Sequence, residues 1–158
     1  MSYKKIDINE LKLNPFETIG KDWLLISAKK GDQVNTMTAS WGGIGVIWNK
    51  NVITAYIRPQ RYTREFVDES DYFTITCFKG YKKELGVLGS KSGRDGDKIK
   101  EVGFDVEMLN NQPTFKQGTM CFTCKKLYRG KIEPEGFIDK DLDIKNYPNH
   151  DYHYIYIG

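Results

Sequence analysis

Short apolar runs separated by turn residues dominate the hydrophobic pattern of this chain. Runs of this length that are rich in β-branched and aromatic residues are typical of strands rather than helices. The pattern is clearest over 72–78, where aromatic or aliphatic residues alternate with smaller polar ones. On the same grounds, we expect strands over 23–28, 52–57, 72–78, 120–128 and 152–157.

Residues 34–48 have the pattern of extended chain, but Gly42, Gly43 and Gly45 interrupt it. The polar triplet 49–51 that follows is expected to form a hairpin turn into the next strand. This part of the chain therefore adds at least one more strand to the set.

Helical signals are brief and lie on the connections. Thr63 is expected to cap a helix that begins at Arg64, because its hydroxyl can accept a hydrogen bond from a backbone amide. A second helix is expected over 81–88, ended by Gly89, and a third over 98–102, between Asp97 and Gly103. Six or more strands with short helices between them predict a mainly β protein, an antiparallel barrel with a few short helices.

The composition narrows the class of protein. With 158 residues, no internal repeat and no linker-like segment, the chain is expected to be a single domain over 1–158. The net charge of +3 comes from interspersed charges, which argues against a nucleic-acid partner. No apolar run approaches the ~20 residues of a membrane helix, and the N-terminus does not resemble a signal peptide. Three cysteines favour a reducing compartment, so we expect a cytoplasmic protein.

Two motifs suggest metal sites, and neither is complete. Cys121 and Cys124 have the spacing of a zinc half-site or a redox pair. Their flanks read as strand, where residues three apart face opposite ways, so we interpret them as structural cysteines. The stretch 139–143 resembles a calcium loop, but Ile144 and His150 stand where Gly and Glu are needed. We therefore expect a solvated acidic loop there and no metal site.

Other catalytic motifs are also incomplete. Gly43 and Gly45 lack the third glycine of a dinucleotide fingerprint, since Trp48 holds that position. The stretch 89–93 lacks the spacing of a triphosphate-binding loop. No nucleophile and base stand in a defensible arrangement, so no catalytic residue is assigned.

Three polar stretches, 35–43, 58–63 and 90–98, remain as candidates for a ligand site. A flavin mononucleotide (FMN) needs cations, hydroxyls and amides for its phosphate, and apolar walls with an amide or cation for its ring. Trp41 and Tyr62 could supply the ring contacts. The phosphate contacts could come from Thr38, Ser40, Arg58, Arg61, Thr63 and Lys91.

Taken in order, these stretches resemble the flavin reductase-like family, particularly its flavoredoxin-type members. The matching segments are 35–41, 58–63, 88–98, 127–130 and 148–154. The resemblance implies a six-stranded antiparallel split barrel, the FMN-binding split barrel, that works as a homodimer with FMN near the subunit interface.

The resemblance also implies which residues line the flavin. The stretches 38–41 and 58–63 would line it, and the loop 90–98 would close over its phosphate or ribityl end. For His153 two interpretations stay open: a role near the flavin, or a strand histidine that pairs locally. The implied FMN-binding residues are Asn35, Met37, Thr38, Ala39, Ser40, Trp41, Arg58, Gln60, Arg61, Tyr62, Thr63, Ser90, Lys91, Ser92, Lys98 and His153.

The family's usual activity is NAD(P)H-dependent flavin reduction, or electron transfer through bound FMN. The Gly-Asp-His stretch of many two-component flavin reductases is absent from this sequence, and no nicotinamide-binding motif is visible. Two alternatives therefore stay open: a non-catalytic FMN electron carrier, and a split-barrel protein that binds another small ligand.

Overall fold

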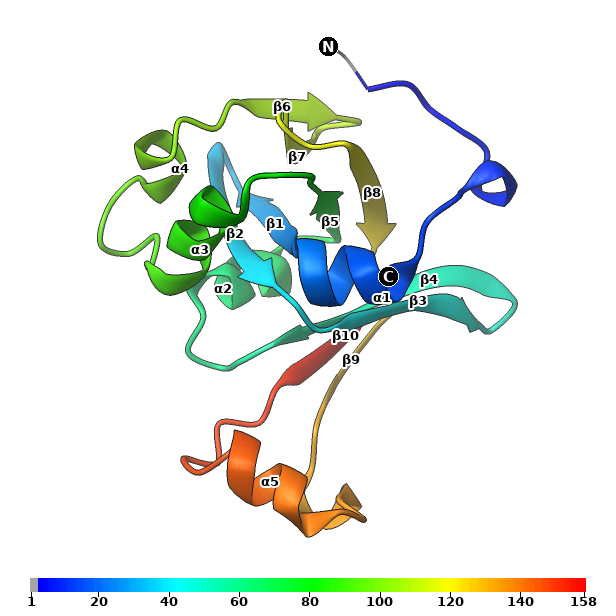
Figure 1. The fold of residues 1–158 in the computed structure, drawn as a ribbon, viewed down its shortest axis with the longest axis vertical. Coiled ribbons are helices and arrows are strands. Elements are labelled where there is room, and N and C mark those ends of the chain that lie inside the picture. Colours follow the sequence, from blue (N-terminus) through cyan, green and yellow to red (C-terminus); the bar gives the residue numbers. More distant parts are fainter. Residues whose placement is uncertain (1–2) are drawn as a thin grey trace.

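The computed structural model describes residues 3–158, so Met1 and Ser2 of the predicted domain lie outside it. Two four-stranded antiparallel sheets form the body (Figure 1). The first has the order β2–β1–β5–β8, with β1 at Leu24–Lys30, β2 at Gln33–Ala39, β5 at Tyr72–Cys77 and β8 at Met120–Lys125. The second has the order β3–β4–β10–β9, with β3 at Gly42–Ile47, β4 at Lys50–Ile57, β10 at Tyr154–Ile157 and β9 at Tyr128–Lys131.

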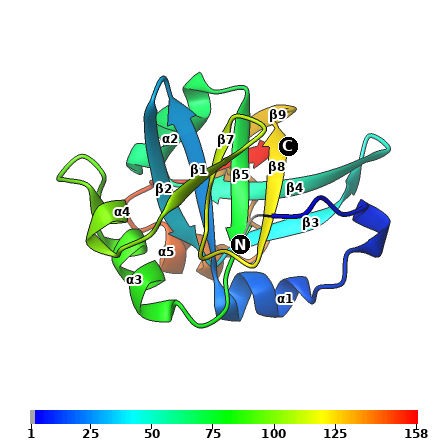
Figure 2. The same ribbon diagram turned by 90° about the horizontal axis from the view of Figure 1, so that it is seen from above.

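The strands of the second sheet run across those of the first (Figure 2). A separate hairpin, β6 at Val106–Leu109 with β7 at Gln112–Phe115, forms a third sheet. The expected mainly β architecture is confirmed, but the expectation of a six-stranded barrel is wrong. The described residues form ten strands in sheets of four, four and two, and these sheets do not close into a barrel.

Short helices occupy the connections. They are α1 (Pro15–Glu17), α2 (Tyr62–Glu69), α3 (Lys82–Ser90), α4 (Lys98–Glu101) and α5 (Lys140–Asn146), with 3-10 turns at Ile8–Glu10 and Pro134–Gly136 and a π turn at Thr18–Asp22. Among the described residues, no helix is long and apolar enough to cross a membrane.

Three local predictions need correction. The helix expected from Arg64 begins at Tyr62, and Thr63 does not cap it because its hydroxyl accepts a hydrogen bond from Asn35. Gly89 lies inside α3 instead of ending it. The expected acidic loop is the start of α5, where the Asp139 carboxylate accepts from the Asp141 amide. The Asp97 cap of α4 is confirmed, since its side chain accepts from the Lys100 amide.

The β3–β4 turn lies one residue earlier than expected. Ile47 pairs with Lys50, which leaves Trp48 and Asn49 as a two-residue turn with φ of 53° and 55°. Two consecutive residues with positive φ match the right-handed twist of hairpin strands. The two positive φ angles that this turn requires are therefore adopted by a tryptophan and an asparagine, where glycine is the more common residue.

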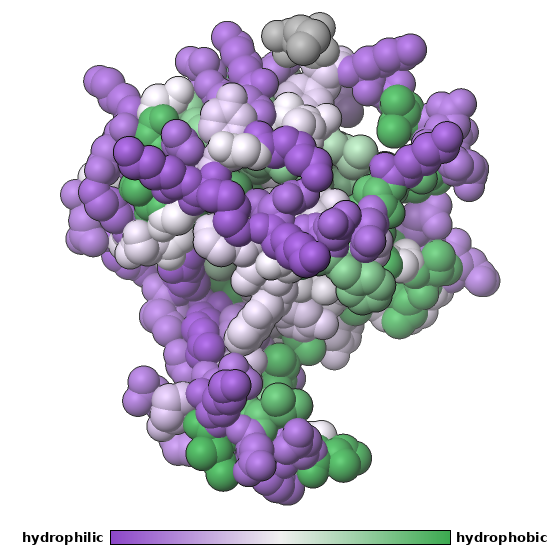
Figure 3. Space-filling view, viewed as in Figure 1, coloured by the Kyte–Doolittle hydropathy of each residue, from purple (hydrophilic) through white to green (hydrophobic). Residues whose placement is uncertain are grey.

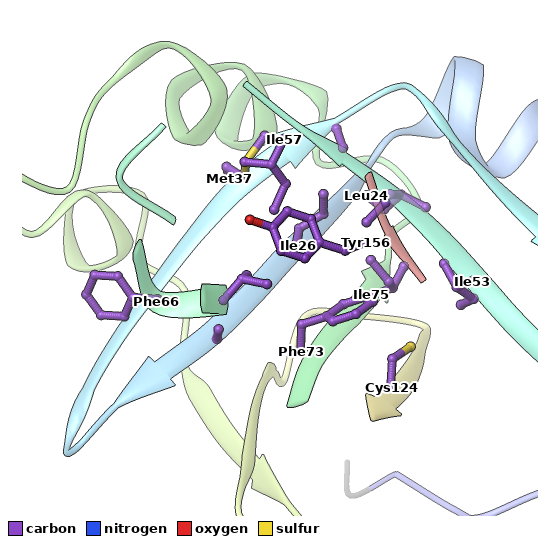
Figure 4. Close-up of a cluster of buried hydrophobic side chains, with 14 of the residues drawn as sticks. Leu24, Ile26, Met37, Ile53, Ile57, Phe66, Phe73, Ile75, Cys124 and Tyr156 are labelled. Atoms are coloured by element: carbon purple, nitrogen blue, oxygen red, sulfur yellow. The ribbon is translucent and has the colours of Figure 1, made fainter. Parts of the chain in front are cut away.

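The hydrophobic core has two parts, one on each face of the first sheet. The part between the two four-stranded sheets surrounds Tyr156, which lies among Ile26, Ile57 and Phe73 (Figure 4). The other part lies under α3, α4 and the β6–β7 hairpin and contains Leu25 and Phe115. Because Leu24 and Leu25 are adjacent on β1, their side chains point into different parts of the core, as expected for a strand that is buried on both faces.

The segment 132–153, which we call the arm, leaves the body between β9 and β10 and carries α5 (Figure 1). Hydrophobic side chains gather on its surface (Figure 3). Ile138 is 97% exposed, and Leu142 and Ile144 are also exposed. Exposed apolar side chains that cluster in this way usually mark a contact surface.

Candidate functional site

Polar side chains from three distant segments meet around β2, the edge strand of the first sheet. We call this group, Asn35, Thr38, Arg61, Thr63 and Lys98, the edge cluster. On one face of β2 the Asn35 amide donates to the Thr63 hydroxyl over 2.9 Å. On the other face the Thr38 hydroxyl donates to the Leu85 carbonyl of α3 over 2.5 Å. The start of α2 and the middle of α3 are thereby fixed to the same strand.

Two cations of the edge cluster contact the C-terminal end of α3. Arg61 donates to the Gly89 carbonyl over 2.8 Å. The ammonium of Lys98 donates to the carbonyls of Leu88 and Lys91, over 2.8 and 2.9 Å. The last carbonyls of a helix lack intrahelical partners and carry partial negative charge, which makes them suitable partners for cations.

These contacts leave hydrogen-bonding capacity unused. Among the described residues, neither Arg61 nor Lys98 contacts a carboxylate. Burial, together with the nearby charge of Arg61, lowers the pKa of Lys98 to about 8. Burial also lowers the pKa of Arg61. One of five arginine donors and two of three lysine donors are used, so the pair retains both positive charge and free N–H groups.

The loop after α3 packs closely against the edge cluster. A Cβ on Gly93 would lie 2.2 Å from Oδ1 of Asn35, which is far inside van der Waals contact. Next to it, the Arg94 guanidinium lies over the Tyr62 ring, 4.4 Å from its centre. Ser90 and Ser92 make only local hydrogen bonds, and Lys91 pairs with Glu101 at the surface. Only glycine allows the loop to approach β2 this closely.

Arg58 and Gln60 lie apart from the edge cluster and bind the arm. Both side chains donate to one oxygen of Asp151 over 2.9 Å. Arg58 also donates to the Asn146 carbonyl over 3.0 Å and stacks on the Tyr147 ring at 5.0 Å. The hydrogen bond from Gln60, with help from Arg58, lowers the pKa of Asp151. These contacts fasten the arm to the end of β4.

An open groove of about 680 Å³ lies between α1, the start of β3 and the arm. Three of the predicted residues line the groove: Ser40, Trp41 and His153. Its remaining walls are mostly apolar or aromatic: Pro15, Phe16, Ile19, Gly20, Gly42, Gly43, Ile44, Tyr56, Ile132, Tyr147 and Ile155. Among these described residues that line it, none is Lys, Arg, Asp or Glu.

His153 forms the back of the groove. It is 7% exposed, its ring lies 5.2 Å from that of Trp41, and its Nδ1 lies 2.7 Å from the Tyr147 hydroxyl. Burial, together with the nearby charge of Arg58, lowers its pKa to about 4, while Asp151 opposes the shift. Arg61 contributes in the same direction, which indicates that the edge cluster and the groove are electrostatic neighbours.

Two predicted residues belong neither to the edge cluster nor to the groove. Met37 and Ala39 alternate with Thr36 and Thr38 on β2, and their side chains belong to the core between the sheets. Only their backbone groups remain available to a ligand. The predicted set is therefore divided among the edge cluster with its loop, the contact with the arm, the groove and the core.

The cysteines take the structural positions expected for them. Cys124 lies in the core between the sheets (Figure 4). Cys121 instead contacts the Thr76 hydroxyl on the other face of the first sheet. All three cysteines are free. Burial raises the pKa of Cys77 and Cys124 to about 12, which keeps these thiols protonated and unreactive.

Solved structures with the same arrangement share the whole fold at low sequence identity. An FMN-binding protein from Thermus thermophilus superimposes with a TM-score of 0.67 and 16% identity, over 99% of this chain and 78% of its own. A flavoredoxin from Methanosarcina acetivorans matches with 0.65 and 21%, over 99% and 72%. An FMN-binding domain of a flavin reductase-like enzyme from Shewanella baltica matches with 0.63 and 19%, over 90% and 71%.

The chain shares the fold of these FMN-binding and flavin reductase-like proteins. No protein-family model matches its sequence, and no curated protein sequence does so. The resemblance in short sequence stretches is thus matched by a resemblance in fold over nearly the whole chain.

Several residues of the groove were not predicted from the sequence. Phe16 and Ile19 come from the turn of chain before β1, and Tyr56 comes from β4. Tyr147 lies in the tail from which only His153 was selected. The sequence does place a tyrosine six residues before His153. This spacing alone does not predict their contact, which depends on the course of the chain after α5.

Proposed function

We propose that this protein is an FMN-binding oxidoreductase of the flavin reductase type. The observation that carries the proposal is the fold, shared with an FMN-binding protein, flavoredoxins and flavin reductases. The two regions described above supply the chemistry that the two ends of FMN require.

The edge cluster fits the phosphate end. A phosphate monoester carries roughly two negative charges near neutral pH. Arg61, which is half-buried, and Lys98, which is buried, are two cations that repel each other and have no carboxylate contact among the described residues. An anion placed between them would relieve this repulsion, and Ser90, Lys91 and Ser92 could add contacts from the loop above.

The groove fits the ring end. Its uncharged, aromatic walls suit a planar ring system, and Trp41 is 48% exposed, so that its face is open to stacking. FMN, when bound, supplies hydride and electron transfer at its ring. The chain's own residues would bind the phosphate, orient the ring and exclude water from its face.

For this reaction type we propose NAD(P)H as the electron donor and a second copy of the chain as the partner. A dimer is supported by the exposed apolar side chains of the arm and by Phe16, which is 85% exposed at the rim of the groove. A stable interface buries about 800 Å² on each partner, so a dimer of this chain would have to cover both patches. Sedimentation of the wild type and of Ile138→Glu would test the dimer, because this charge should shift the protein toward monomer.

The flavin proposal is tested by adding FMN to purified protein and measuring bound flavin by absorbance and dialysis. We expect stoichiometric yellow protein, and turnover of NADH or NADPH with FMN present. Protein that takes up no FMN would overturn the proposal.

A non-catalytic electron carrier is the second candidate. The lack of charged residues in the groove favours it, because a nicotinamide dinucleotide brings a pyrophosphate that needs cations. Bound FMN together with negligible NAD(P)H oxidation would select the carrier over the reductase.

A further inference from the structure

Tyr147 and His153 form a buried side-chain pair at the back of the groove. Both residues line it, and they are 5% and 7% exposed. The Tyr147 hydroxyl and Nδ1 of His153 lie 2.7 Å apart, which is a good hydrogen-bond length. The two rings pack edge to face with their centres 5.6 Å apart, so the hydrogen bond and the ring contact together fix the orientation of the imidazole.

The direction of this hydrogen bond follows from the available partners. A buried phenol must donate its proton to an acceptor, and Nδ1 is the only acceptor within reach of this hydroxyl among residues 3–158. Burial raises the pKa of Tyr147, which keeps the phenol protonated, while the Arg58 guanidinium stacked on its ring opposes this rise. If Tyr147 donates to Nδ1, the proton of a neutral imidazole lies on Nε2.

Nε2 is then the free end of the pair. Nε2 makes no hydrogen bond to any group among the described residues. Within the described range 3–158, the fully buried side-chain atoms without a partner are oxygens of Glu107, Gln112 and Asp151, and Nε2 of His153 is not among them. Since His153 lines the groove, whatever lies in the groove is the available partner for Nε2.

We propose that Tyr147 is a positioning residue that holds His153 as its Nε2-protonated tautomer, so that the groove presents a neutral N–H donor to an acceptor atom of a bound ring. The assignment of the tautomer stands on geometry alone. The consequence for a flavin or nicotinamide ring rests on the proposed function.

The surroundings keep this donor uncharged. Arg58 faces the pair from the end of β4, Asp151 from the arm and Arg61 from the start of α2, while Tyr56 on β4 contacts the imidazole edge to face. Burial dominates over these charges and lowers the pKa of His153 to about 4. The N–H donor should therefore persist unchanged across neutral pH.

The tautomer can be read directly from the nitrogen shifts of the imidazole in ¹⁵N-labelled protein. The chain has two histidines, so a His150→Gln background leaves His153 as the single signal. We expect a pyrrole-like Nε2 and a pyridine-like Nδ1 at pH 7, and a mixture of tautomers in Tyr147→Phe. A protonated Nδ1 in the parent protein, or no change in Tyr147→Phe, would overturn the proposal. The parent spectrum needs no Tyr147 variant, so a folding defect in Tyr147→Phe leaves the test intact.

The functional consequence is tested with a double-mutant cycle on FMN affinity and on turnover. Tyr147→Phe and His153→Leu should each cost about fivefold, the value of one ordinary hydrogen bond. The double variant should cost no more than His153→Leu alone, because Tyr147 acts through His153. His153→Gln, which keeps an N–H donor, should recover part of the loss. Additive losses would refute the coupling, whereas a failure to bind FMN in every variant and in the parent would refute the proposed function and leave the tautomer measurement valid.

Discussion

The edge cluster and the groove are neighbouring regions with opposite electrostatic character: the first contains two cations, and the second has no charged residue among the described residues of its walls. The edge cluster holds a buried cation, Lys98, and a half-buried one, Arg61, and satisfies both with backbone carbonyls at the end of α3 instead of carboxylates. The groove excludes formal charge from its walls and keeps its histidine neutral. A ligand that spans both must be anionic at one end and uncharged and flat at the other. The difference between the regions therefore describes the ligand more closely than either region alone.

The largest expected effect comes from removing the cations. Arg61→Gln and Lys98→Met should each weaken FMN binding about 10- to 100-fold, because each deletes a charge-assisted hydrogen bond to phosphate. Equilibrium dialysis would measure this loss. Lys100→Met, which changes an exposed lysine on the same helix, is the matched control and should bind normally. Equal affinity in the Lys98 and Lys100 variants would separate the edge cluster from the ligand.

The pH dependence of FMN binding tests the same contact between Lys98 and the phosphate. The pKa of Lys98 is lowered to about 8 in the ligand-free protein, and a bound phosphate would raise it. FMN affinity should therefore be flat below pH 8 and fall above it, by up to about tenfold per pH unit. Titration calorimetry between pH 7 and 10 would show the fall. Lys98→Met should remove this pH dependence, and a persistent fall in that variant would assign it to another group.

Removing the exposed ring of the groove should have a smaller effect. Trp41→Ala should weaken FMN about five- to tenfold, as expected for the loss of one stacked aromatic contact. The quenching of tryptophan fluorescence by added FMN should also decrease. Trp48→Ala, at the distant β3–β4 turn, is the control. Undiminished quenching in the Trp41 variant would place the ring elsewhere.

Arg58→Ala should have the smallest effect on binding. Its guanidinium contacts Asp151, the Asn146 carbonyl and the Tyr147 ring, so its loss should loosen the arm while FMN affinity falls less than about fivefold. Hydrogen exchange of the amides over 146–151 should become faster. A loss of binding as large as that of Arg61→Gln would place Arg58 on the phosphate.

The sequence predicted the parts of the fold whose signals are local. The strands with continuous apolar runs appear within a few residues of their expected positions, as over 72–78. The strands β6, β7 and β9 were missed because four residues are too few to show a clear alternation, and β7 contains Pro113. Their pairing is decided by neighbouring strands, which a local pattern does not record.

The site was less predictable for a related reason. Strand periodicity could have placed Met37 and Ala39 in the core, since both alternate with Thr36 and Thr38. In contrast, nothing near Arg61 in the sequence reveals that it reaches the end of α3, 28 residues away. The groove likewise joins residues near 16 to residues near 153, and such a contact is visible only after folding.

The exposed isoleucines of the arm carry a consequence for handling the protein. If a second copy covers them and completes the groove, occupancy of the groove must obey mass action between copies as well as with the ligand. Diluting a yellow preparation at constant free FMN should then bleach it, and concentrating the sample should bring the colour back.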